Sequence, residues 1–191
     1  WKVNIPQDLP EKDKILAINS IKDFAGAVDK DAQESLPGYK DDVRMLSIFG
    51  MFYNGIGNAV AAEKVLQMAH SIAPNKQLVS FELIRSYLIN QKYEEAYILA
   101  KETYNSAPAY PESVRWYSIS AAYNKKLIET QKLLEKNNQT VPFDNDILSA
   151  LVSTGQISTA IELLNEAKKK NPEYTTEIDT YIKQLLVTPR K

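Results

Sequence analysis

The stretch Val43–Pro74, VRMLSIFGMFYNGIGNAVAAEKVLQMAHSIAP, carries the pattern on which the architecture of this chain rests. Its final proline is the first of three that lie at equal spacing along the chain, Pro74, Pro108 and Pro142. Two of the three prolines follow an alanine, in Ala73-Pro74 and Ala107-Pro108. A fixed period of about 34 residues indicates one supersecondary unit copied several times. Stacked helical units form surfaces that hold partners more readily than pockets for chemistry.

Each copy of the unit combines small and large apolar residues at helical spacing. The small residues predict that two helices approach closely, and the large ones fill the space beside them. Gly57 and Gly155 are predicted to relieve the corner between two helices. The fourth copy is shorter than the others and ends at Pro172. The recurring residues in the first two copies are Leu46, Phe49, Gly50, Tyr53, Ala62, Leu66 and Ala69, and then Ser80, Leu83, Ile84, Tyr87, Ala96, Ala100 and Thr103.

Further helices are predicted on both sides of the repeats. Residues 11–34 show an apolar stripe at three- and four-residue steps, and Ser35-Leu36-Pro37-Gly38 then ends this helix. Asp41 and Asp42 favour the N-terminus of the next helix through its dipole. Residues 175–187 form a last amphipathic helix that covers the end of the stack. The stripe residues are Ile15, Ile18, Ile21, Ala25 and Val28 in the first helix, and Ile178, Ile182, Leu185 and Leu186 in the last.

The repeat pattern resembles that of the tetratricopeptide repeat family over roughly residues 43–174. The resemblance implies an all-α fold, a right-handed superhelix of antiparallel helix pairs, with a concave groove lined by the first helix of each pair. The third repeat departs from the pattern at Thr130 and Asn137, so its second helix is expected to be displaced or to end before Asn137-Asn138. We expect three parts: an N-terminal extension with a helix (1–38), about four repeats of which the third and fourth are degenerate (39–174), and a C-terminal capping helix (175–191).

Composition excludes several classes of function. The chain has 23 Lys and Arg against 24 Asp and Glu, and this near balance removes the phosphate attraction that most nucleic-acid binders need. It has no cysteine, so disulfides, thiolate nucleophiles and Cys-ligated metals are excluded. The absence of cysteine fits the cytoplasm and the bacterial periplasm equally, so the compartment stays open. The chain begins at Trp1, as an excised domain or a processed protein would.

The run from Met45 to Ala62 is uncharged and nearly long enough to span a bilayer. Asn54, Gly55, Gly57 and Asn58 would place a turn and two amides in its middle, which hydrocarbon does not tolerate. We therefore expect two buried helices with a Gly-rich turn between them, and no membrane insertion by this segment.

The sequence offers little for catalysis. The single histidine, His70, is expected near the end of a helix, where it complements the helix dipole. Asp144-Asn145-Asp146 begins like a calcium loop but lacks its continuation, so a helix cap is expected instead. Gly55-x-Gly57 lacks the third glycine and the strand of a dinucleotide loop. Lys168-Lys169-Lys170 closes a helix, where cations are favourable. We predict no enzyme activity, no metal site and no cofactor.

The resemblance places ten residues in the ligand groove, and their mixture of cations and apolar groups suits a partner peptide or helix with apolar anchors and some acidic groups. The positions that would form a two-carboxylate clamp for chaperone tails are Ser47, Met51, Glu82, Glu112 and Trp116, which are not clamp residues. The predicted groove consists of Arg44, Ser47, Met51, Asn54, Phe81, Arg85, Leu88, Arg115, Ile119 and Tyr123.

Two functions follow from this reading. The first is a non-catalytic module that binds another protein or a peptide in the groove. The second rests on the phrase Ala73-Pro74-Asn75-Lys76-Gln77, which resembles the C-terminal repeat region of bacterial membrane proteins of the O-antigen ligase or polymerase type. That resemblance implies a soluble extracytoplasmic domain of a larger membrane enzyme, with the residues of glycosyl transfer outside this chain.

Overall fold

A computed structural model describes residues 8–126, 129–130, 132–133 and 144–187, and every element within these ranges is helical. The chain divides into two compact units, Trp1–Asn90 and Gln91–Lys191, which are called unit 1 and unit 2 and are described separately. The predicted all-α class is confirmed for the described residues.

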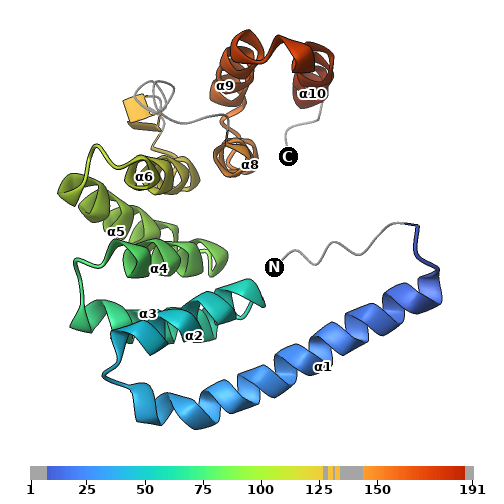
Figure 1. Cartoon of the computed structure of the whole chain (residues 1–191). Coiled ribbons are helices and arrows are strands. Elements are labelled where there is room, and N and C mark those ends of the chain that lie inside the picture. The colour runs from blue at the N-terminus through green and yellow to red at the C-terminus, as the bar shows by residue number, and fades with distance from the viewer. Residues whose placement is uncertain (1–7, 127–128, 131, 134–143, 188–191) are drawn as a thin grey trace. The chain divides into compact units, whose positions relative to one another are not determined.

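Unit 1 is a row of helices in which each element contacts the next along the chain (Figure 1). Helix α2 packs against α3 and α4, and α3 packs against α4. The uncharged run from Met45 to Ala62 forms most of α2, a turn and the start of α3, as predicted. The elements are α1 (Glu11–Ser35), the 3-10 helix η1 (Leu36–Tyr39), α2 (Val43–Gly55), α3 (Ala59–Ile72) and α4 (Gln77–Ile89).

Helix α1 packs on the rest of unit 1 near its C-terminus, where Asp29 is hydrogen-bonded to Tyr53 of α2. Its N-terminal half extends past α2 and α3 (Figure 1), and Ala32 near its C-terminus is its one buried residue. The chain leaves α1 at Ser35 and makes the 3-10 turn η1, where the sequence predicted a stop. Asp42 then caps α2, because its carboxylate accepts hydrogen bonds from the backbone N–H groups of Arg44 and Met45 at 2.9 and 3.1 Å.

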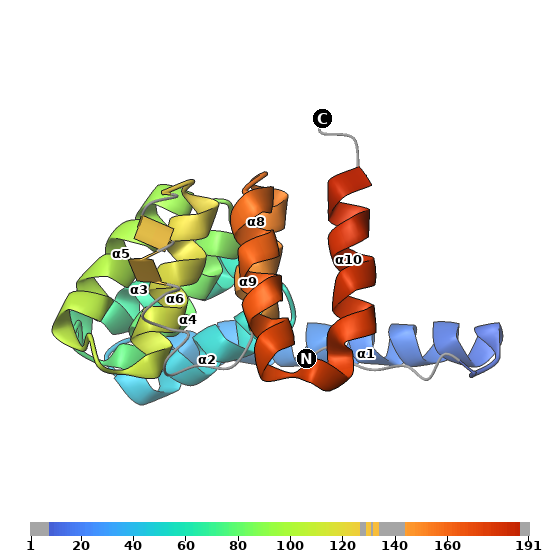
Figure 2. The ribbon, with the colours of Figure 1, turned by 90° about the horizontal axis from the view of Figure 1, so that it is seen from above.

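Unit 2 is a second row of helices, with α5 packed on α6, α6 on α8, α8 on α9 and α9 on α10 (Figure 2). Between α6 and α8, Glu129, Thr130, Lys132 and Leu133 are helical, and the predicted end of that helix before Asn137-Asn138 lies outside the described residues. The elements are α5 (Tyr93–Ser106), α6 (Pro111–Tyr123), α8 (Asn145–Ser153), α9 (Ile157–Lys170), the 3-10 helix η2 (Pro172–Tyr174) and α10 (Thr175–Val187).

The repeat is visible in where the helices begin. The first helices α2, α4, α6 and α8 start at equal intervals along the chain, at Val43, Gln77, Pro111 and Asn145. The first three have 13 residues, whereas α8 has 9. The contraction that the sequence shows in the fourth repeat is therefore a loss of one helical turn from its first helix.

The predicted interplay of small and large residues is confirmed in unit 1. Gly50 of α2 faces Leu66 of α3, and both are buried. A Cβ added at Gly50 would lie 2.3 Å from Cγ and 2.4 Å from Cδ2 of Leu66. Ala62 and Ala69 of α3 are fully buried as well. Glycine at position 50 thus allows α2 and α3 to approach at a distance that any larger residue would prevent.

We predict that Gly50→Ala lowers the free energy of unfolding by about 1–3 kcal/mol, because the new methyl group has no room beside Leu66. The matched control is Gly26→Ala in α1, where nothing lies within 4 Å of the added Cβ. That change should stabilise by about 0.5–1 kcal/mol through helix propensity alone. Urea denaturation followed by far-UV circular dichroism measures both; equal effects of the two variants would contradict the close approach.

Candidate functional site

Two neighbouring first helices of unit 1 expose apolar side chains in matching stripes. On α2 the stripe contains Arg44, Ile48 and Met51, spaced four and three residues apart. On α4 it contains Leu78, Glu82, Arg85 and Ile89, with steps of four, three and four residues. Ile48, Met51, Leu78 and Ile89 are between 43 and 48 % exposed. These seven residues are called the first-helix face.

Buried hydrogen bonds join the two stripes. Asn54, one turn beyond Met51, donates from Nδ2 to the carbonyl oxygen of Glu82 at 2.9 Å and to its carboxylate at 2.8 Å. Ser86 donates to Oδ1 of Asn54 at 2.9 Å. Asn54 and Ser86 are buried, so the bond between them, which helps to fix the register between α2 and α4, is shielded from solvent.

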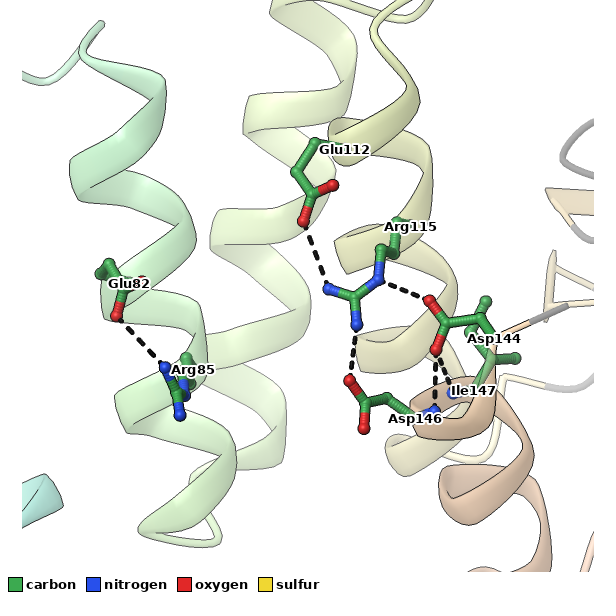
Figure 3. Close-up of polar contacts among 7 residues, drawn as sticks. All are labelled: Glu82, Arg85, Glu112, Arg115, Asp144, Asp146 and Ile147. Carbon is green, nitrogen blue, oxygen red and sulfur yellow. Dashed lines mark hydrogen bonds and ion pairs between the residues drawn. The ribbon is translucent and has the colours of Figure 1, made fainter. Parts of the chain in front are cut away.

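The first-helix face carries more positive than negative charge. Its single acid, Glu82, already accepts from Asn54 and lies 3.9 Å from Arg85 (Figure 3). Arg44 is exposed at the start of α2. Two guanidinium groups therefore accompany one carboxylate whose acceptor capacity is partly used. The face suits apolar groups with an acid nearby.

The corresponding junction in unit 2, between α6 and the start of α8, has the opposite balance. Arg115 of α6 contacts three carboxylates, one with each guanidinium nitrogen (Figure 3). Nε lies 2.5 Å from Asp144, Nη2 2.5 Å from Asp146 and Nη1 3.2 Å from Glu112. Asp144 also caps α8, accepting from the N–H groups of Asp146 and Ile147 at 2.8 and 3.3 Å. The predicted helix cap at Asp144 is confirmed.

The surroundings of Arg115 indicate that this residue has a structural role. Burial alone would lower the pKa of Arg115, but the hydrogen bond and charge of Asp144, with the charges of Glu112 and Asp146, raise it. Trp116 adds a cation–π contact, with the guanidinium 5.0 Å from its ring centroid. The guanidinium of Arg115, which was predicted to bind a partner, is thus already bound by the chain's own carboxylates.

The structure distributes the ten predicted groove residues unevenly. Seven lie in unit 1 and three in unit 2, and their binding of a ligand stays a prediction. The structure brings Asn54 and Arg85 together around Glu82. Arg44 and Met51 are exposed; Arg85, Leu88, Arg115 and Tyr123 are half-buried; Ser47, Asn54, Phe81 and Ile119 are buried.

A cluster of tyrosines in unit 2 surrounds a carboxylate that the sequence analysis did not single out. Tyr97 of α5 and Tyr117 of α6 both donate their hydroxyl protons to Glu129. Lys101 of α5 lies 3.8 Å from the same carboxylate, and Lys126 lies over the ring of Tyr97 at 5.4 Å. These contacts link the short helical piece after α6 to both neighbouring helices.

The cluster keeps Glu129 charged. Burial would raise the pKa of Glu129, but hydrogen bonds from Tyr117 and Tyr97 and the charges of Lys101 and Lys126 lower it below its ordinary value. Burial and the bond to Glu129 raise the pKa of Tyr117. A carboxylate that is stabilised in its charged form is a poor proton donor near neutral pH, so this cluster anchors helices and does not suggest acid–base chemistry.

The other residues considered for chemistry have structural positions. His70 lies in the last turn of α3, as predicted. Lys168, Lys169 and Lys170 lie in the last turn of α9, where Lys168 pairs with Asp179 of α10 at 2.7 Å. Gly57 occupies the turn between α2 and α3 with φ of +81°, so its role is conformational. Within the described ranges, no group of three or more His, Asp and Glu side chains is arranged to hold a metal ion.

Neither a model of a known protein family nor a curated protein matches this chain. Among the described helices, none combines the length and the apolar character needed to cross a bilayer.

We predict that Arg115→Gln lowers the free energy of unfolding by about 1–3 kcal/mol, because it leaves Asp144, whose side chain is 11 % exposed, without its cation. The matched control is Arg85→Gln, whose one ion pair is 3.9 Å long and 42 % exposed on the arginine side. Such exposed pairs contribute about 0–1 kcal/mol. Urea denaturation compares the two variants; a larger loss for Arg85→Gln would contradict a structural role for Arg115.

We also predict a pH-dependent contribution from Glu129. Because the pKa of Glu129 is lower in the folded chain than in the unfolded chain, its stabilisation is present above the unfolded pKa and is lost as pH falls through the folded pKa. Glu129→Gln should therefore cost about 1–2 kcal/mol at neutral pH and progressively less in acid. Unfolding free energies of both proteins across the acid range test this, and a difference that grows as pH falls would contradict it.

Proposed function

We propose that this chain is a non-catalytic protein-interaction module, in which a peptide or helix of a partner packs against the first-helix face of unit 1. The observation that carries the proposal is the exposure of Ile48 and Met51 on α2 and of Leu78 and Ile89 on α4, two helices that pack against each other. Contiguous apolar patches on a protein surface mark interaction sites when polar residues surround them.

The chemistry of the face supports a partner with apolar anchors and a nearby acid. Met51 adapts its shape to different partner groups because its side chain is unbranched and flexible. Arg44 and Arg85 provide donors that suit a carboxylate. In unit 2, by contrast, Arg115 already contacts Asp144, Asp146 and Glu112. We therefore assign recognition to unit 1.

The proposed architecture is a right-handed superhelix of antiparallel helix pairs of the tetratricopeptide type. The equal spacing of the first helices along the chain supports it, as does the packing of each helix on its neighbours within a unit. In such an array the first helices of successive pairs share one surface, which is where a partner segment would lie.

The proposal is tested by selecting peptides from a random phage-displayed library on the immobilised full chain. The best peptide is then titrated by fluorescence anisotropy. We predict that Met51→Glu and Leu78→Glu each weaken binding at least about tenfold, because each places a carboxylate where an apolar anchor of the peptide packs. Far-UV circular dichroism checks that the variants fold.

The matched control is Val60→Glu, since Val60 is exposed on the second helix α3 of the same unit. It should leave the affinity unchanged. Selection of no peptide, or equal losses in all three variants, would overturn the proposed function.

A further inference from the structure

The two arginines of the first-helix face have different surroundings. Arg85 lies 3.9 Å from Glu82 (Figure 3), whose carboxylate also accepts a hydrogen bond from Asn54 at 2.8 Å. The guanidinium of Arg44 is exposed and makes no hydrogen bond or ion pair within the described ranges. Asp42, two residues earlier, uses its carboxylate to cap α2. Arg44 is therefore the cation of this face that can bind a carboxylate from outside without losing a bond of its own.

Hydrogen bonds between α2 and α4 show where the residues of the face lie along the two helices. The chain reverses direction after α2 and again after α3, so α2 and α4 run in roughly the same direction. Asn54 contacts both Glu82 and Ser86, and therefore lies level with the point midway between them. Ile48 and Leu78 are each six residues before that level, or about 9 Å toward the N-terminal ends of the helices. These two apolar side chains thus lie at the same height on the face.

Arg44 and Ile89 mark the two ends of the face. Arg44 is four residues before Ile48, so it lies about 6 Å beyond the apolar pair toward the N-terminal ends of the helices. Ile89 is 11 residues after Leu78 and lies about 16.5 Å away in the other direction. Met51 lies between these ends. The face therefore presents, in order, an unpaired cation, an apolar pair, a flexible apolar side chain and a last isoleucine.

We propose that the partner segment carries a carboxylate that binds Arg44, next to an apolar anchor that packs on Ile48 and Leu78, and a second apolar anchor that packs on Ile89. This inference rests on the proposed function and adds to it the charge and the order of the groups that the face recognises. One unpaired guanidinium beside apolar side chains suits a single carboxylate. It does not suit a nucleic acid, which is bound by several cations along its backbone.

The residues outside the described ranges offer few acids of the chain's own for this place. Residues 1–7 contain Lys2 and no acidic side chain, and residues 188–191 contain two cations and no acidic side chain. In the remaining segments the one acidic side chain is Glu135, and Lys136 follows it directly. We therefore expect the carboxylate on Arg44 to come from another molecule, and Glu135 is tested as the alternative source.

The test uses the peptide that is selected from the random library on the immobilised full chain and is titrated by fluorescence anisotropy. Arg44→Gln should weaken its binding at least about tenfold, because a charge-assisted hydrogen bond is lost. Replacing the acid of the peptide by its amide should weaken binding to the natural chain by a similar factor. The same replacement should have little further effect on binding to Arg44→Gln, because the two changes remove one interaction. Added salt should weaken binding to the natural chain more than binding to Arg44→Gln.

The matched control changes Glu82→Gln and Arg85→Gln together. It removes the ion pair within the face, keeps the net charge of the chain and leaves Arg44 in place. The affinity for the peptide should change less than about threefold, because this pair is satisfied within the chain and is not used by the partner. Far-UV circular dichroism shows whether each variant keeps its helices.

Double-mutant cycles test the order of the groups. Leu78→Ala and Ile89→Ala are each combined with alanine substitutions along the peptide. The apolar peptide residue nearest the acid should couple to Leu78, and the apolar residue farthest from the acid should couple to Ile89. The reverse order would overturn the inference.

The outcomes separate this inference from the proposed function. A selected peptide without an acid, or a loss in Arg44→Gln no larger than in the control, overturns the inference alone, because the proposed function depends on Met51→Glu and Leu78→Glu. A gain of affinity in Glu135→Gln would show that the chain's own acid competes for Arg44, and would also overturn it. Selection of no peptide overturns the proposed function and this inference together.

Discussion

The turn between the first and second helix of each pair is the constraint on which the arrangement depends. One residue in each of these turns has a left-handed backbone, namely Gly57, Gln91, Lys125 and Gly155, with φ between +56 and +81°. The first three are equally spaced along the chain, and the last follows after a shorter interval. Glycine adopts this conformation freely, whereas other residues pay roughly 1–2 kcal/mol. Gln91 and Lys125 nevertheless adopt it, so the left-handed backbone of these turns does not depend on glycine.

Side-chain amides beside these turns tie one helix pair to the preceding one. Asn90, after α4, donates to the carbonyl oxygen of Ala59 at 3.1 Å, at the start of α3. Asn124, after α6, donates to the corresponding residue Tyr93 at 3.4 Å, at the start of α5. After the shortened helix α8, Gln156 donates to Ala122 of α6 at 2.7 Å instead. A side-chain amide therefore also joins the fourth helix pair to the preceding one, in this case through α6.

The sequence predicted the helices well because their signals are local. Apolar stripes, turn residues and capping aspartates act within a few residues, and α1 and the Asp144 cap were confirmed. The repeat period was confirmed because it recurs along the sequence itself. Contacts between residues in successive helix pairs were missed, although Asn90 and Asn124 are themselves one period apart. The link between Tyr97 and Glu129 has no signal in the sequence, because it depends on how α5 and the helical piece after α6 are packed.

Because contacts between helices were not predicted, the sequence also could not show which of the predicted groove cations are already paired. A list of groove residues counts Arg85 and Arg115 as equivalent cations, since both lie on first helices. The structure distinguishes them by what lies near each: Glu82 at 3.9 Å beside Arg85, but three carboxylates within 3.2 Å of Arg115. A guanidinium whose nitrogens are all engaged would have to break existing charge-assisted bonds to accept a partner's acid, which costs more than the new bond gains. The neighbouring helix thus determines whether a cation on a repeat surface is available to a ligand. The residue type alone does not show whether that cation stabilises the fold or binds a ligand.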